Sequence, residues 1–224
     1  MAIFRIILLC LIAASCSVSH KQAMDSLKQS TIHYGSVEEF KYEPIPDKGI
    51  DFALDESSDS FIFQSGKSYY KAFLLPKRND SYYIIVRSYC LGDHIKIAHI
   101  FYPHLILLDE KFTEIAQSDF VGSWKKVAFG EGPSVHWGGP RIMLEDNLFV
   151  DCLQARYLIV STTDKLLDST TPRRIFNLEF IPLIVPPYFI WIPIPTGHRT
   201  LQIKHSPFGI FHIEIADKPL PVKE

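Results

Sequence analysis

Short runs of strand-forming residues, each ended by proline, glycine or a cluster of polar turn residues, restrict the fold of this chain more than any other feature. A helix requires apolar residues at a sustained spacing of about 3.6, and that spacing is weak outside residues 21–29 and 163–168. Roughly ten short strands separated by turns are typical of sandwiches and jelly-rolls. The sequence therefore predicts an all-β fold, an antiparallel β-sandwich or jelly-roll-like single domain.

The strands are expected between such breaks, where β-branched and aromatic residues gather. They are placed at 40–42, 51–63, 68–75, 81–90, 96–101, 104–108, 142–144, 148–150, 156–162, 201–205 and 209–215. Because short polar turns join neighbours, 68–75 is expected to pair with 81–90, and 201–205 with 209–215.

The first sixteen residues resemble a bacterial lipoprotein signal. Arg5 supplies a charged start, residues 6–12 an apolar core, and Ala-Ala-Ser precedes Cys16. The core is too short to span a bilayer, which requires about 20 apolar residues. In such lipoproteins cleavage leaves the cysteine first in the chain, carrying diacylglycerol and a fatty acyl group such as palmitate. Cys16 is therefore the expected membrane anchor; the alternative is plain secretion with a free Cys16.

These observations divide the chain into a lipoprotein signal peptide (1–15), a polar tether (16–38), a β-sandwich domain (39–216) and a tail (217–224). Two or more acyl chains, at about 0.8 kcal/mol per buried methylene, suffice for stable anchoring. Ser17 follows the anchor where inner-membrane lipoproteins commonly have aspartate. The expected location is the periplasmic side of the cell envelope, with the outer membrane favoured.

Charge and motifs argue against several function classes. The 23 basic and 25 acidic residues include no long basic run, so we expect no nucleic-acid partner. Nine histidines lack metal-ligand spacing. There is no Gly-x-Ser-x-Gly, phosphate-loop or dinucleotide motif. The adjacent carboxylates Asp109-Glu110 and Glu145-Asp146 diverge and are expected in hairpin turns, not as an acid/base pair. We therefore expect no enzyme activity, no metal and no cofactor.

Cys90 and Cys152 remain once Cys10 is assigned to the signal and Cys16 to the anchor. An even pair in a chain that enters an oxidising compartment is compatible with a disulfide. A loop of about 60 residues closed in this way would contribute roughly 4 kcal/mol. The alternative is two separate buried thiols, and the period of two within 81–90 places Cys90 on the more apolar face of its strand.

Residues 121–141 form a glycine-rich stretch without regular structure, and loops of this length are often functional. An indole is the flat apolar platform that a sugar ring needs. Our hypothesis is that Trp124 and Trp137, helped by Arg141, line a carbohydrate or partner groove. The alternative is that both indoles cover the end of the sandwich.

Residues 176–195 are almost entirely apolar, but prolines stand at 182, 186, 187, 193 and 195. Each interior proline costs a helix about 3 kcal/mol, so this segment is expected to be extended instead of a membrane-spanning helix. Either Tyr188, Trp191 and their neighbours contact a protein or lipid headgroups, or the segment packs across the sandwich.

Several pieces of the chain resemble the bacterial maltose operon periplasmic protein family. Phe101–Phe112 (FYPHLILLDEKF) has the family's aromatic, proline, strand and Leu-Asp turn. Phe40–Pro46 (FKYEPIP), Tyr157–Thr171 (YLIVSTTDKLLDSTT) and His205–Ile215 (HSPFGIFHIEI) resemble further pieces in the expected order. The resemblance covers roughly 40–216, although the family members have a plain secretory signal and a longer C-terminal region.

What this resemblance implies is an accessory role in maltose or maltodextrin transport. The expected partners are a maltodextrin or a component of its uptake system, and the family offers no catalytic residues to transfer. The alternative function is that of a structural or assembly lipoprotein that docks an envelope protein and is unrelated to sugar.

Overall fold

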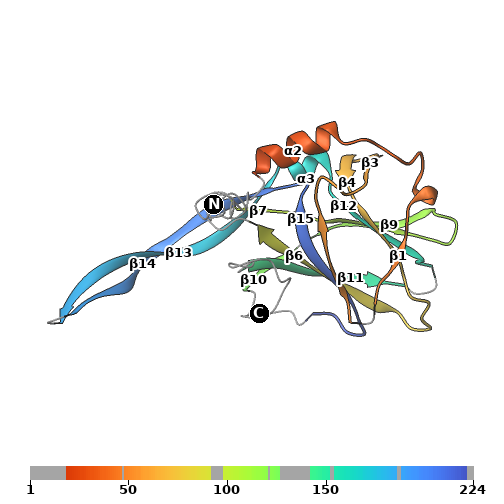
Figure 1. Cartoon of the computed structure of the whole chain (residues 1–224). Helices are drawn as coiled ribbons and strands as arrows, with labels where there is room; N and C mark the ends of the chain where they lie inside the picture. The colour runs from red at the N-terminus through yellow and green to blue at the C-terminus, as the bar shows by residue number, and fades with distance from the viewer. Residues whose placement is uncertain are drawn as a thin grey trace, which may run out of the picture.

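Two sheets of mostly antiparallel strands pack face to face and form the body of the molecule (Figure 1). The computed structural model describes residues 19–46, 48–91, 98–120, 122–126, 142–151, 154–185 and 188–220. The predicted all-β, sandwich-like single domain is confirmed. The five-stranded sheet consists, in spatial order, of β1 (Glu43–Pro44), β5 (Lys71–Leu74), β12 (Tyr157–Ser161), β8 (His104–Leu108) and β9 (Glu114–Asp119).

The second sheet has eight strands, and β6 lies at its centre. From one edge the order is β10 (Ser123–Lys126), β11 (Ile142–Val150), β6 (Tyr82–Leu91), β15 (Gly209–Ala216) and β2 (Ile50–Leu54). The end of β6 also pairs with β7, and the sheet continues from there through β7 (His99–Ile100), β14 (Tyr188–His205) and β13 (Thr170–Val185). Two of the pairings, β1 with β5 and β7 with β14, are parallel.

The core lies between the inner faces of the two sheets. Phe73 of β5 and Phe211 of β15 are both fully buried, and the rings of Phe211 and Phe101 stack with their centroids 5.3 Å apart. Cys90 is in the same core, which confirms the expected apolar face of its strand. Burial of such side chains contributes roughly 1.5–3 kcal/mol each.

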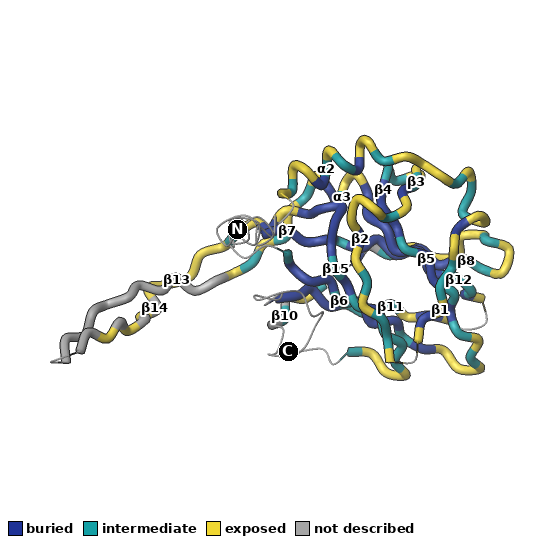
Figure 2. Tube along the Cα trace, viewed as in Figure 1, coloured by how far each residue is buried: buried dark blue, intermediate teal, exposed yellow. Residues whose placement is uncertain are grey.

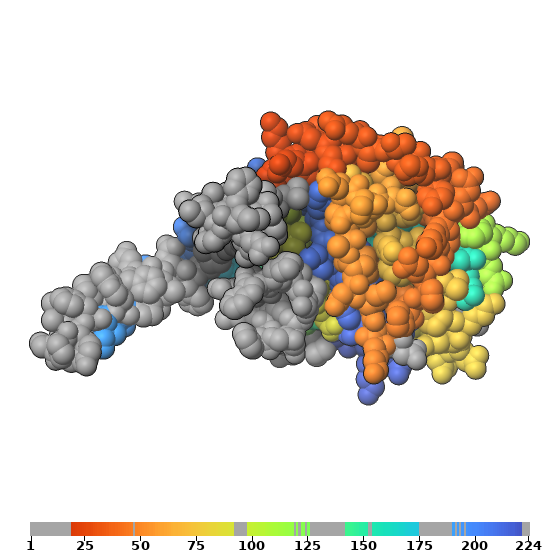
Figure 3. Space-filling model, in the orientation of Figure 1, coloured from red at the N-terminus to blue at the C-terminus, as the bar shows by residue number. Residues whose placement is uncertain are grey.

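The N-terminal part of the described chain belongs to the body. Helix α2 (His20–Gln29) begins at a capping box of Ser19 and Gln22 and ends within a residue of the expected position. Its Ala23 and Leu27 are 0% and 4% exposed and join the core. Figure 3 shows the red and orange N-terminal residues lying along the body. The prediction of a tether over 16–38 is therefore wrong from residue 19 onward, because the apolar side of α2 is buried.

Neither predicted strand pair forms. Strands β5 and β6 lie in different sheets, because the N–H of Leu75 bonds the carbonyl of Arg156 and the chain then crosses between layers. Strands β14 and β15 likewise pair with other strands. Two consecutive strands bury the same alternate side chains whether they pair in one sheet or lie in opposite sheets. Their sequence pattern therefore does not distinguish the two arrangements.

The expected turn at Glu145-Asp146 is also absent, since β11 runs through it as one strand from Ile142 to Val150. Glu145 lies directly opposite Arg87 on β6, and this ion pair replaces the turn. The expected turn at Asp109 is present and joins β8 to β9. The strand expected at 40–42 begins only at Glu43, after the short 3₁₀ helix η1 (Val37–Glu39).

A small hairpin of β3 (Ser60–Phe63) and β4 (Gly66–Tyr69) covers part of the outer face of the five-stranded sheet. Its turn is fixed to helix α3 (Asp164–Leu167), because the N–H of Asp164 bonds the carbonyl of Ser65 at 3.0 Å. Gly66 has φ +123°, and a Cβ there would collide with the Asp164 carboxylate. Only glycine therefore fits this turn.

Strands β13 and β14 pair along their whole length and project from the body as a hairpin, here called the arm (170–205) (Figures 1 and 2). The predicted extended conformation is confirmed for 176–185 and 188–195, and the alternative of packing across the sandwich is wrong. Among the described strands, β14 pairs with β13 and, at Lys204 and His205, with β7. No helix within the described ranges is long and apolar enough to cross a membrane.

Candidate functional site

The outer face of the five-stranded sheet carries a second, aromatic-rich cluster. Ile106 and Leu108 of β8 and Ile159 of β12 point outward, while Leu107 and Leu158 point into the main core. Aromatic rings from the N-terminal segment, the β3–β4 hairpin, the β8–β9 turn and the start of β12 pack against them. These rings belong to Tyr34, Phe40, Tyr42, Phe61, Phe63, Phe112 and Tyr157, and Tyr70, just after β4, joins them. The covering is incomplete and leaves a pocket.

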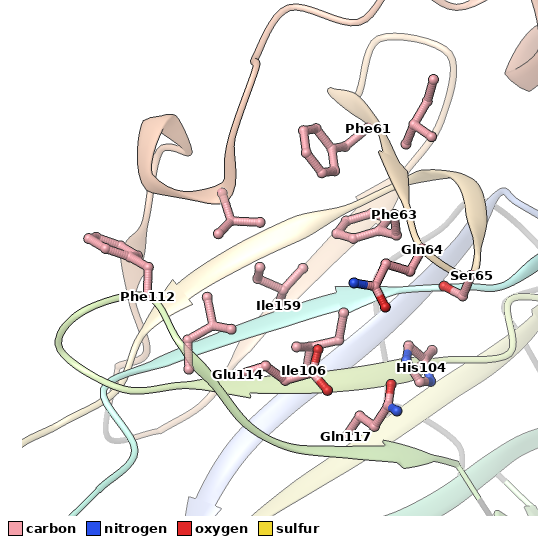
Figure 4. A pocket seen from close by; sticks show the side chains of 13 residues that line it. Phe61, Phe63, Gln64, Ser65, His104, Ile106, Phe112, Glu114, Gln117 and Ile159 are labelled. Atoms are coloured by element: carbon pink, nitrogen blue, oxygen red, sulfur yellow. The ribbon is translucent and has the colours of Figure 1, made fainter.

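This pocket has a volume of about 270 Å³, close to the lower end of the range of ligand sites. Ile106 and Ile159 form its floor, and the β3–β4 hairpin and the β8–β9 turn form its walls (Figure 4). The lining residues are Val37, Phe61, Ile62, Phe63, Gln64, Ser65, His104, Ile106, Leu108, Phe112, Glu114, Gln117 and Ile159.

One end of the pocket is polar. Gln64 and Ser65 lie in the β3–β4 turn above, and Gln117 and His104 lie on β9 and β8 below (Figure 4). Gln64, Gln117 and Glu114 are exposed, so a ligand can reach them from solvent. Their amides offer both donors and acceptors, and the carboxylate offers acceptors.

The other end is aromatic and contains a strained residue. Phe112 has φ +60°, an unusual conformation for a bulky side chain. The carboxylate of Asp109 holds the turn by accepting bonds from the N–H groups of Lys111 (2.7 Å) and Thr113 (2.9 Å). The ring of Phe112 stacks on Tyr157 with centroids 4.6 Å apart. Backbone strain of this kind is often found at binding sites, where it holds a group in place.

Two tyrosines behind the pocket remain neutral at physiological pH. Burial raises the pKa of Tyr42 and, to a smaller extent, so does the neighbouring Tyr157. Burial also raises the pKa of Tyr70, with smaller effects from Asp59 and nearby tyrosines. The pocket therefore offers aromatic surface and amide groups without phenolate charge.

A row of alternating charges crosses the outer face of the other sheet. Lys125 and Arg87 both contact Glu145, whose side chain is 4% exposed; the Arg87 contact is 2.6 Å. A second nitrogen of Arg87 lies 2.8 Å from Glu214. Burial alone would raise the pKa of Glu214, but hydrogen bonds and charges from Arg87 and His212 outweigh it and hold this pKa below its usual value. We interpret this row as a structural ion network.

The described structure does not gather the sequence-predicted contact residues. Trp124 lies in β10 with its backbone opposite Leu144, and Trp137 and Arg141 lie outside the described residues. Tyr188 and Trp191 lie in β14, opposite Val185 and Pro182 in the arm. Their side chains and that of Trp124 are not described, and Cys16 also lies outside the described residues.

Cys90 is a buried free thiol, which contradicts the possible Cys90–Cys152 disulfide and agrees with the alternative of separate thiols. Val150 lies opposite Tyr82, eight residues along β6 from Cys90, or roughly 26 Å. Cys152 lies outside the described residues, but it is two residues from Val150, and two residues of chain span at most about 7 Å. Because a disulfide requires its two Cα atoms within about 7 Å of each other, this reach is too short to bridge to Cys90. Burial raises the pKa of Cys90 to about 11, with Arg173 acting in the opposite direction.

The pocket residues escaped sequence analysis because they come from separate segments. Phe61 was assigned only to a strand and Phe112 only to the end of a motif, and Gln64 was not singled out. The available signal was the number of aromatic residues in short strands and turns, which did not specify a common location. In the parts of the chain that the structure describes, no cluster of three or more metal-binding side chains occurs.

Comparison of this chain with protein-family models, curated proteins and solved structures finds no match.

Proposed function

We propose that this protein is a cell-envelope lipoprotein that binds a carbohydrate in the pocket of the five-stranded sheet, as an accessory to maltose or maltodextrin transport. The observation that carries the proposal is the pairing of an aromatic end at Phe112 with a polar end at Gln64 and Gln117. The resemblance to the maltose operon periplasmic protein family supports the choice of sugar.

The chemistry of the pocket matches that of a sugar ring. One face of a pyranose is formed by C–H groups and packs against aromatic rings such as those of Phe61 and Phe112. The hydroxyl groups at its edge need partners that both donate and accept hydrogen bonds, as the amides of Gln64 and Gln117 do. The volume of about 270 Å³ fits one end of a short oligosaccharide better than a long chain.

Calorimetric titration of the purified protein with maltose through maltoheptaose tests the ligand. Saturable binding is expected, and the double variant Gln64→Ala/Gln117→Ala should weaken it by at least about tenfold, because each lost hydrogen bond contributes roughly 1 kcal/mol. Gln29→Ala, on the exposed end of α2, is the matched control and should bind as the wild type does.

The absence of binding to every sugar in the series would overturn the proposed ligand. Binding that survives the double variant unchanged would move the site away from this pocket.

Anchoring is tested separately. In this proposal Cys16 carries the acyl groups that hold the protein in the envelope. Mass spectrometry of protein extracted from membranes should show an acylated residue 16 at the N-terminus, and Cys16→Ser should release the chain into the soluble fraction. An unmodified Cys16 would indicate plain secretion.

A further inference from the structure

The distal part of the arm, from the pair Leu178–Pro195 to the pair Val185–Tyr188, extends for roughly 25 Å. A two-stranded hairpin is marginally stable in water by itself. This part of the arm pairs only with itself among the described strands. An external surface that covers it would therefore stabilise it.

The three side chains that the structure describes in the distal arm are apolar and exposed. Ile190, Ile192 and Ile194 are 49%, 39% and 40% exposed. Residues 178–195 contain one charged residue, Glu179. Because successive residues of a strand point to opposite faces, a run with so few polar residues cannot give a ribbon one fully polar face. The interfacial layer of a bilayer, which is partly apolar and partly hydrated, suits such a ribbon better than a flat partner surface on one side.

Positive charge gathers where the apolar part ends. Arg174 and Arg199 occupy adjacent rungs of the ladder, and Lys204 lies nearer the body; all three are exposed. Within the arm Glu179 is the one acidic residue. Cationic side chains beside an apolar segment match the anionic headgroups of phospholipids, at about 1 kcal/mol per residue near the surface.

The proposed lipid anchor is attached on the same side of the molecule as the arm. His20, at the start of α2, contacts the carbonyl of His205 at the base of the arm, with Nε2 2.7 Å from the oxygen. Four residues of chain, at most about 14 Å, separate His20 from Cys16 whatever their conformation. An acyl group on Cys16 therefore brings the base of the arm close to the membrane.

The prolines of the arm argue against a protein partner that adds a strand. Pro182, Pro193 and Pro195 face Trp191, Phe180 and Leu178. The three prolines thus occur at every second residue pair of the β13–β14 ladder. Proline has no N–H, so a strand tolerates it at positions whose N–H would point away from the paired strand. The free edges thus lose donors that another strand would need. At the headgroup level, water and phosphates can satisfy the edge groups that remain.

We propose that the arm is a membrane-docking element, in which the apolar segments 178–185 and 188–195 lie in the headgroup region of an anionic bilayer and Arg174, Arg199 and Lys204 contact its phosphates. The proposal rests on the proposed lipidation of Cys16 for its geometry, but not on sugar binding. The arm and the acyl group then form two attachments that fix the orientation of the body at the membrane.

Vesicle flotation tests the arm without the acyl group. The mature chain from residue 16 with Cys16→Ser should float with vesicles of phosphatidylcholine and phosphatidylglycerol, and at least about tenfold more weakly with phosphatidylcholine alone. Ile190→Ser/Ile192→Ser/Ile194→Ser should abolish flotation. Arg174→Gln/Arg199→Gln/Lys204→Gln should remove the preference for anionic lipid. The control Ile115→Ser, at an isoleucine of the body that is 37% exposed and lies outside the pocket lining, should float as the parent does.

The proposal is overturned if the parent chain binds neither type of vesicle, or if the isoleucine variant binds as well as the parent. Sedimentation of the same chain without lipid measures its oligomeric state. A stable dimer that the isoleucine variant abolishes would also overturn the proposal, because the arm would then bind a second copy of the chain. Circular dichroism of each variant establishes that the body is folded. Acylation of the wild-type chain is measured separately, so failure of the anchor and failure of the arm are distinguishable.

Discussion

The body and the arm are built from the same kind of strand but are stabilised differently. In the body most strands of the sandwich contribute side chains to a buried core, and Phe73, Phe211 and Leu158 are 0% exposed. In the arm the strands are twice as long as most of these, yet Ile190 is 49% exposed. The body thus buries most of its large hydrophobic residues, with a few exceptions such as Phe149, whereas the described Ile190, Ile192 and Ile194 of the arm are all exposed. This contrast leads us to assign ligand binding to the body and docking to the arm.

The largest expected difference between the two regions is the effect of a truncated apolar side chain. Phe211→Ala should lower the free energy of unfolding by about 3–5 kcal/mol, because the ring packs against Phe52 and Phe101. Ile192→Ala in the arm should change it by less than about 0.5 kcal/mol. Urea denaturation of the purified variants measures both. A comparable loss from Ile192→Ala would mean that the arm is packed as the body is.

The ion network on the eight-stranded sheet provides the next test of the body. Glu145→Ala leaves Arg87 and Lys125 without their buried partner, and a loss of about 2–3 kcal/mol is expected, less than for a fully buried pair because Arg87 is 22% exposed. Asp51→Ala, at the exposed end of the row beside His212, should cost less than about 0.5 kcal/mol. Equal effects of the two substitutions would contradict the proposed structural role of Glu145.

The junction of arm and body should respond to acid, and this is the smallest of the three effects. Burial lowers the pKa of His205, while its hydrogen bond to the carbonyl of Leu166 acts in the opposite direction. As the pH decreases, His205 is protonated in the unfolded state before it is protonated in the folded state. Its contribution to the free energy of unfolding is therefore fully present above the ordinary histidine pKa of about 6.5, and it is lost as the pH falls from there toward the lower pKa of the folded state.

Urea denaturation between pH 8 and pH 5 should therefore show a steeper loss of stability in the wild type than in His205→Gln. The two proteins are compared at each pH, so other titrating groups cancel. Parallel pH profiles would mean that His205 does not couple protonation to the folding of this junction.

Much of this contrast could be predicted from the sequence, because it depends on local pattern. Alternation within 81–90 predicted a half-buried strand with Cys90 on the core side, and the prolines of 176–195 predicted an extended segment. Pairing between distant strands could not be predicted, since β5 and β6 bury the same residues whether they form a hairpin or separate. For the same reason the sequence did not reveal that Gln64 and Gln117 line the same pocket, or that Glu145 lies opposite Arg87.

The most direct test of the account is hydrogen exchange of the mature Cys16→Ser chain, free and bound to phosphatidylglycerol vesicles. In the free protein the amides of β6 should be strongly protected, whereas those of 188–200 in β14 should exchange orders of magnitude faster, because a two-stranded ribbon opens easily. Vesicles should slow exchange in the arm and leave β6 unchanged. An arm that is as protected as β6 without lipid, or whose exchange is unaffected by vesicles, would contradict the division of the molecule into a self-sufficient body and a membrane-docking arm.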